Sequence, residues 1–250
     1  MHLNKEQITT YIKCPFMLAI ETALGSSRAT VHSQTLKAIL EKLGNIKPIV
    51  SDHKKKINDI RLYLSELASF ELKNNTKLSL SEYRIKFTNK FYTKGTEVLD
   101  AKGIIANLNK VFDIFADNVF MGYNVPIDIP IQGTSLIFRD TIDFLLTDEE
   151  SNIFAVELVD LTEAKLLKQR LLHWAHYHTQ YSFLAASFDK DIDVILIDPV
   201  TATKLALVYK PEKFDQDLKD FKLLAQPMQH NNLVKNLHMC PMCEYNKYCH

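Results

Sequence analysis

The sequence lacks the features that mark membrane, secreted or highly charged proteins. It has no apolar run long enough to span a membrane, and its start, MHLNKEQITTYIK, lacks the apolar core of a signal peptide. Its 30 Lys and Arg residues balance 30 Asp and Glu residues, so it has no net charge with which to coat nucleic acid. There is also no internal repeat and no low-complexity linker. We therefore expect a globular protein in the cytoplasm, where cysteines are kept reduced.

Cysteine is scarce and unevenly distributed. Three of the four cysteines lie in the C-terminal segment CPMCEYNKYCH, spaced C-x2-C-x5-C, and the fourth lies near the other end: Cys240, Cys243, Cys249 and Cys14. Thiolates at this spacing bind soft or borderline metals, and a closed site needs a fourth ligand. The candidates for that ligand are Cys14, His238 and His250. A zinc site would use the three local cysteines with a histidine, whereas an iron–sulfur cluster would need Cys14.

Hydrophobic periodicity predicts helices ahead of a group of strands. Helical patterns cover 5–24, 30–42, 47–72 and 82–120, with a Ser-Asp start signal at 51–52. Short β-rich runs follow at 124–133, 135–150 and 151–161, then a helix from 162, strands at 191–199 and 203–211, and a helix at 212–224. This order predicts one α/β domain over 1–250, with a mostly helical part (1–120), a sheet core (121–210) and a C-terminal helix with the cysteine segment (211–250).

Two segments at opposite ends of the chain resemble a known nuclease family. TTYIKCPFMLAIE has an aromatic residue and a Cys-Pro pair in the first helix, and CPMCEYNKYC has a second Cys-Pro pair. Together they resemble the iron–sulfur nucleases of the RecB/AddB type, which include CRISPR-associated exonucleases of the PD-(D/E)XK superfamily. The resemblance implies a restriction-endonuclease-like core, a mixed central sheet flanked by helices. It also implies a [4Fe-4S] cluster that joins the chain ends, held by Cys14, Cys240, Cys243 and Cys249.

The resemblance further implies a metal-dependent nuclease site between the cysteines. His32 on the second helix, Asp143 in FRDTIDFLL and Glu157 in FAVELVDL would hold Mg2+ or Mn2+, and the Leu158 carbonyl would complete the shell. A carboxylate within an apolar strand is costly to bury unless it is paired or metal-bound, which supports Asp143. Asp140 lies on the opposite face of an ideal strand and is the second choice.

The lysine expected two residues after Glu157 is absent, because Val159 occupies its place. Strand alternation puts Val159 on the face of Glu157 and Asp160 on the opposite face, so Asp160 does not replace the lysine. Lys165 or Lys168, in the first turns of the following helix, would reach back over the strand end. The alternative is a degenerate site in a fold kept for structure or binding.

A polar and aromatic stripe follows on that helix. Gln169, His173, Tyr177 and Tyr181 are four residues apart and share one helical face. By the resemblance, the first three orient the site and contact a DNA strand through stacking and hydrogen bonds, and His173 stands where the family has glutamine. We expect Trp174 to pack on the sheet instead.

Two functions are consistent with these patterns. The first is a Mg2+- or Mn2+-dependent deoxyribonuclease. It would be an exonuclease acting on DNA ends or single strands in recombination, repair, CRISPR adaptation or phage DNA metabolism, with a helicase or another recombination protein as partner. The second is a catalytically inactive member that binds DNA or a protein partner, which Val159 and His173 favour. A zinc-stapled binding module without iron is a third alternative.

Overall fold

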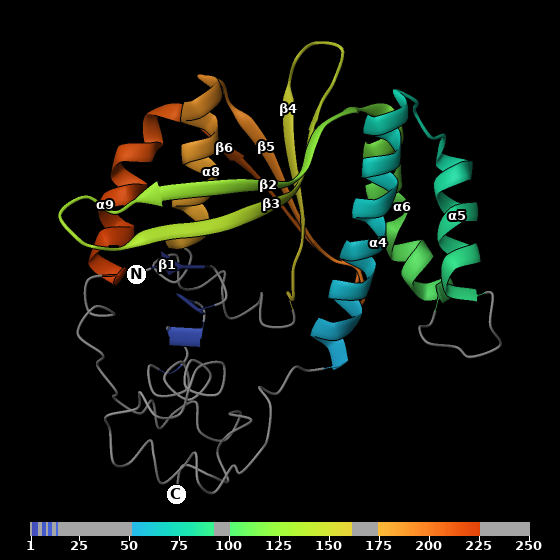
Figure 1. Ribbon diagram of the computed structural model, residues 1–250, viewed down its shortest axis with the longest axis horizontal. Helices are drawn as coiled ribbons and strands as arrows, with labels where there is room; N and C mark the ends of the chain where they lie inside the picture. The colour runs from blue at the N-terminus through green and yellow to red at the C-terminus, as the bar shows by residue number, and fades with distance from the viewer. Residues whose placement is uncertain are drawn as a thin grey trace, which may run out of the picture.

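Helices flank a sheet in the computed structural model of the chain (Figure 1). The structure describes residues 2–4, 7–8, 10–11, 14, 52–92, 101–161 and 175–225. Within these residues, no helix is long and apolar enough to cross a membrane.

The described elements follow the predicted order, with helices first and a sheet second. The helices are α4 (Asp52–Asn74), α5 (Leu80–Tyr92), α6 (Ala101–Asp117), α8 (Ala175–Phe188), the 3-10 turn η3 (Pro211–Lys213) and α9 (Phe214–Ala225). The strands are β1 (His2–Leu3), β2 (Val119–Pro130), β3 (Ile137–Thr147), β4 (Ile153–Leu158), β5 (Ile192–Asp198) and β6 (Thr203–Tyr209). The expectation of an α/β fold is confirmed.

Strands β2 to β6 form an open mixed sheet in the order β2-β3-β4-β5-β6. The first three are antiparallel neighbours, β4 runs parallel to β5, and β6 is antiparallel to β5. The short β1 pairs in parallel with the start of β3, at Ile137 and Phe138. Because β4 and β5 are parallel, their carboxyl ends lie together at one end of the sheet, which is where ligand sites form in open α/β sheets.

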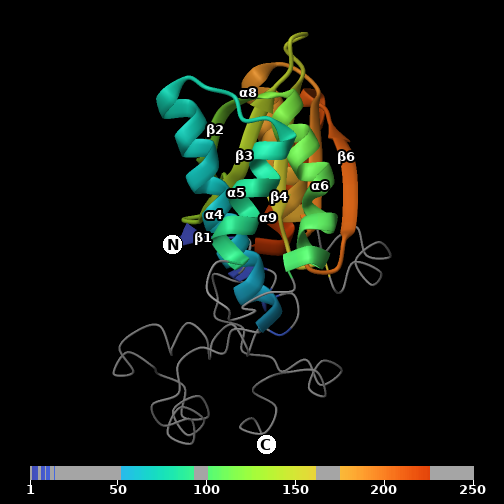
Figure 2. The same ribbon diagram turned by 90° about the vertical axis from the view of Figure 1, so that its right-hand side faces the viewer.

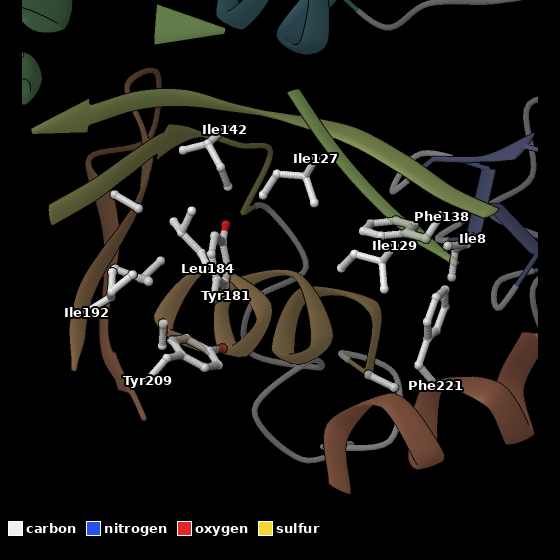
Figure 3. Close-up of a cluster of buried hydrophobic side chains, with 14 of the residues drawn as sticks. Ile8, Ile127, Ile129, Phe138, Ile142, Tyr181, Leu184, Ile192, Tyr209 and Phe221 are labelled. Atoms are coloured by element: carbon white, nitrogen blue, oxygen red, sulfur yellow. The ribbon is translucent and has the colours of Figure 1, made fainter. Parts of the chain in front are cut away.

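Helices cover both faces of this sheet. α4, α5 and α6 lie on one face, and α8 and α9 lie on the other (Figures 1 and 2). The face under α8 and α9 has a buried apolar cluster that includes Tyr181 and Phe221 (Figure 3). The opposite cluster includes Phe115 and Phe144, whose ring centroids are 4.9 Å apart in an edge-on contact. Burial of these two clusters is the main driving force for the three-layer arrangement.

Short-range chemistry explains several element boundaries. α4 begins at Asp52, as the Ser-Asp signal predicted, and a carboxylate in the first turn is favoured by the helix dipole. α5 follows a capping box: the Ser79 Oγ accepts from the Glu82 N–H at 3.3 Å, and the Glu82 carboxylate accepts from the Ser79 N–H at 2.8 Å. In the acidic turn between β3 and β4, the Asn152 N–H donates to the Asp148 carboxylate at 2.8 Å.

The prediction of a helical region over 82–120, weakened at Gly95 and Gly103, is wrong at its C-terminal end. The described part of the region contains α5 and α6, and α6 ends at Asp117. β2 begins at Val119, which pairs with Thr147, and Phe120 pairs with Leu146. An apolar pair such as Val-Phe suits a helix or a strand equally, and here pairing with a strand later in the chain decides the conformation.

Candidate functional site

Two buried acidic residues lie where the pairing of β3 and β4 ends. β3 and β4 are antiparallel, and the pair of Phe144 with Val156 is the one next to Asp143 and Glu157. The backbone N–H of Leu158, the residue after Glu157, donates to the Asp143 carboxylate at 2.8 Å. Asp143 is 5% exposed and Glu157 is 2% exposed. The structure therefore places the two carboxylates singled out from the sequence on neighbouring strands and buries both.

The Asp143 carboxylate accepts hydrogen bonds from a backbone N–H and from an arginine side chain. Its Oδ2 accepts from the backbone N–H of Leu158 at 2.8 Å and from Nε of Arg61 at 2.9 Å. Arg61 projects from α4, and its Nη2 also donates to the Leu158 carbonyl oxygen. The guanidinium thus bridges Asp143 and the Leu158 carbonyl, two of the four ligands expected for a metal ion.

Glu157 is held from the opposite layer. The Gln180 side chain on α8 donates its Nε2 to the Glu157 Oε1 at 3.0 Å. Tyr181, the next residue, is buried, and burial together with the nearby Glu157 carboxylate raises the pKa of its hydroxyl well above its usual value. The Tyr181 hydroxyl therefore stays protonated beside the carboxylate. The Gln180 Oε1 is buried and has no hydrogen-bond partner within the described part of the chain.

The residues that follow Glu157 alternate as expected. Leu158 belongs to the apolar cluster under α4, α5 and α6, whereas Val159 packs against the cluster under α8 and α9. Asp160 lies back on the α4 side, where it is 3.7 Å from His53. Val159 therefore lies on the face of Glu157, and Asp160 does not supply a group there.

Several predicted site residues lie outside the described residues: His32, Lys165, Lys168, Gln169, His173, Cys240, Cys243 and Cys249. Cys14 is described and buried, and its N–H donates to the Thr10 carbonyl at 2.9 Å. Tyr177 is described and half-buried on α8, with its ring centroid 6.3 Å from that of Tyr181. Asp140 is half-buried, and its carboxylate accepts the N–H of Thr141 at 2.7 Å.

Sequence reasoning missed Arg61 and Gln180. Arg61 lies 82 positions before Asp143, and Gln180 lies 23 positions after Glu157, so each contact depends on tertiary packing. The available signal for Arg61 was one arginine among apolar residues in INDIRLYL. In the described part of the chain, Arg61 is the cation that contacts Asp143.

The donor atoms suit a hard divalent cation. Two carboxylates and a backbone carbonyl are oxygen ligands of the kind that Mg2+ and Mn2+ prefer. The buried Gln180 Oε1 is a further acceptor, and no donor among the described residues reaches it. An acceptor of this kind is suited to a hydrogen bond from a metal-bound water. Arg61 supplies the compensating positive charge at Asp143 and the Leu158 carbonyl.

The fold and this geometry define an α/β protein with a buried carboxylate pair on adjacent strands of a mixed sheet. No protein-family model and no curated protein matches the chain.

Proposed function

We propose that the chain is a metal-dependent deoxyribonuclease with a PD-(D/E)XK core of the RecB/AddB type. One observation carries the proposal: Asp143 on β3 and Glu157 on the neighbouring β4 are both buried, with the Asp143 carboxylate against the backbone of Leu158. Arg61 compensates one of these two buried carboxylates, and the negative charge that remains favours the binding of a further cation. The β-β-β-α-β order of the sheet supports the same core.

Each residue then has a distinct role in the proposed reaction. Bound Mg2+ or Mn2+ polarises the scissile phosphate and lowers the pKa of the attacking water. Asp143, Glu157 and the Leu158 carbonyl hold the ion together with His32. Gln180 fixes the Glu157 carboxylate through its Nε2. Because ligand carboxylates need such outer partners to keep their orientation, Gln180 belongs to the working site.

The remaining residues of the proposal bind DNA and provide charge. Lys165 or Lys168 takes the role of the lysine that Val159 replaces. Gln169, His173 and Tyr177 contact a single strand or a DNA end by stacking and hydrogen bonds. A helicase or another recombination protein is the proposed protein partner.

We propose a [4Fe-4S] cluster at Cys14, Cys240, Cys243 and Cys249. Four thiolates and the buried position of Cys14 suit such a cluster, and Zn2+ is the alternative. Anaerobically purified protein should be brown, and Cys14→Ser should lose the visible absorption while retaining its far-UV circular dichroism. Colourless wild-type protein with one equivalent of zinc would assign the site to Zn2+ instead.

The test of the nuclease is cleavage of end-labelled single-stranded DNA with Mn2+. The isosteric variants Asp143→Asn and Glu157→Gln should lose at least a hundredfold in rate, because each removes a negatively charged ligand of the ion. Asp140→Asn is the matched control, since it changes an aspartate on the same strand that contacts Thr141. Equal rates in Asp143→Asn and Asp140→Asn would refute the proposal.

A second candidate is an inactive nuclease fold that binds DNA or a protein partner. Arg61 favours it, because a guanidinium on Asp143 and the Leu158 carbonyl satisfies these two groups without metal. Val159 also favours it, because it occupies the position of the family lysine. This function predicts that fluorescence polarisation detects binding of single-stranded DNA in EDTA and that Mn2+ produces no cleavage. Cleavage that depends on Asp143 excludes it.

A further inference from the structure

A second group of metal-binding side chains lies at the carboxyl ends of β4 and β5. His53 in the first turn of α4, Asp160 after β4 and Asp198 at the end of β5 place their ligand atoms within 4.8 Å of one another. His53 Nε2 is 2.8 Å from Asp198 Oδ2 and 3.7 Å from Asp160 Oδ1. Three elements that are distant in sequence therefore meet at these three side chains.

Asp198 is a preorganised carboxylate. It is fully buried, and three backbone N–H groups hold it: those of Val200 and Thr201 donate to Oδ1 at 3.0 and 3.2 Å, and that of Leu161 donates to Oδ2 at 3.2 Å. These contacts fix the position of the carboxylate before any ion arrives. Its Oδ2 faces His53.

The other two side chains leave the group open to solvent. The Asp160 side chain is 40% exposed and the His53 side chain is 21% exposed. An ion from solution can reach them without any rearrangement of the core. The buried Asp198 fixes one ligand position.

We propose that His53, Asp160 and Asp198 form a binding site for a divalent transition metal. Ligands at about 2.1 Å from an ion lie about 3.0 Å apart when adjacent and about 4.2 Å apart when opposite. The distance of 2.8 Å from His53 to Asp198 is close to the first value, and the distance of 3.7 Å from His53 to Asp160 lies between the two. One imidazole nitrogen and two carboxylate oxygens suit Mn2+, Fe2+ or Zn2+, and Mg2+ prefers oxygen ligands alone. Three protein ligands leave the remaining positions to water.

This site is separate from the carboxylate pair of the proposed nuclease. The two proposed sites share no ligand, and their nearest ligand residues, Leu158 and Asp160, are two positions apart, which is about 6 to 7 Å along an extended chain. Paired catalytic ions lie only about 4 Å apart. Metal bound at His53 therefore joins the first turn of α4 to the ends of β4 and β5, and its existence does not depend on the nuclease proposal.

The test is titration of the full-length chain with Mn2+, followed by electron paramagnetic resonance of the free ion. An Asp143→Asn background weakens the site at the carboxylate pair. In that background we expect one bound Mn2+, with affinity lowered at least tenfold by Asp160→Asn and unchanged by Asp193→Asn. Both substitutions remove an exposed aspartate at or near the end of a central strand, so neither opens the core.

A second readout identifies the histidine. Pulsed resonance of bound Mn2+ should show coupling to an imidazole nitrogen that His53→Gln removes and His32→Gln leaves in place. Mg2+ should compete at least tenfold more weakly than Zn2+. Equal Mn2+ affinity in the Asp160→Asn and Asp193→Asn proteins, or nitrogen coupling that persists in His53→Gln, would overturn the proposal and make the three residues a structural contact of α4.

Discussion

Replacing Arg61 with methionine tests whether the guanidinium and a divalent cation compete for Asp143. The change keeps the length and much of the apolar stem but removes the donors to Asp143 and the Leu158 carbonyl. Asp143 then keeps the hydrogen bond from the Leu158 N–H. A hydrogen bond to a charged group contributes about 2 kcal/mol, and the 29% exposure of the Arg61 side chain keeps the cost below that of a fully buried pair.

In EDTA, Arg61→Met should therefore unfold about 2 kcal/mol more easily than wild type, or about 4 to 8 °C lower in Tm. If the same interaction opposes metal binding, its loss tightens the Mn2+ affinity about thirtyfold. At a concentration of about 100 times the variant's Kd, Mn2+ stabilises the variant by about 2.7 kcal/mol and wild type by only about 0.9 kcal/mol. The stability difference between the two proteins should nearly vanish.

Urea unfolding of both proteins in EDTA and in Mn2+ measures this effect. Metal at His53 adds the same increment to both proteins and cancels in the comparison. Arg139→Met is the matched control, because Arg139 forms a hydrogen-bonded pair with Asp128 on the surface, with side chains more than half exposed. The loss of unfolding free energy in Arg139→Met should be small and independent of Mn2+. A deficit in Arg61→Met that is the same with and without Mn2+ would refute competition and make Arg61 a structural contact alone.

Two further predictions concern buried polar groups. Gln180→Met removes the hydrogen bond of 3.0 Å to Glu157 and should lower the free energy of unfolding in EDTA by about 1 to 3 kcal/mol. Gln216→Met is the control, because it removes an exposed contact with Asp220 and should change the urea midpoint little. Equal effects of the two substitutions would contradict the role given to Gln180. Burial raises the pKa of Glu71, and hydrogen bonds from Tyr83 and Leu78 partly offset this rise. The fold therefore favours the protonated carboxyl group. The stability that this protonation contributes is present at low pH and is lost as the pH rises through the pKa of the folded state. Glu71→Gln should accordingly gain stability relative to wild type between pH 4 and pH 7, measured as urea midpoints, and a difference that does not change with pH would argue against it.

The order of elements was predictable because periodicity is a local property. The strands around Asp143 and Glu157 could be placed from apolar runs and turn signals, and the carboxylates stood out because an acid in an apolar strand needs a partner. The start of β2 was not predictable, since Val119 and Phe120 suit either conformation until β3 pairs with them. Pairing of this kind is decided by contacts far apart in sequence.

The partners of the carboxylates were not predictable for a related reason. A helical pattern shows which face of α4 is buried, but not which strand end that face meets. From the sequence alone, Arg61 could not be distinguished from the other polar residues of the helix. Asp198 was predicted only as part of the strand at 191–199, and the structure buries it against His53. In both cases the packing of α4 on the sheet creates the contact.

The charges around Asp143 and Glu157 determine what Arg61 does once a cation binds. Two carboxylates and one guanidinium leave one net negative charge, and a divalent ion that displaces the guanidinium makes the carboxylate pair neutral. In the proposed nuclease, Arg61 would stay anchored on α4 nearby, and its charge would become available to a phosphodiester as an alternative to Lys165 or Lys168. The rate of DNA cleavage by the Arg61→Met protein then distinguishes two roles of Arg61. Tighter Mn2+ binding with slower cleavage assigns to Arg61 the electrostatic role of the missing lysine, and tighter binding with faster cleavage makes Arg61 a competitor alone.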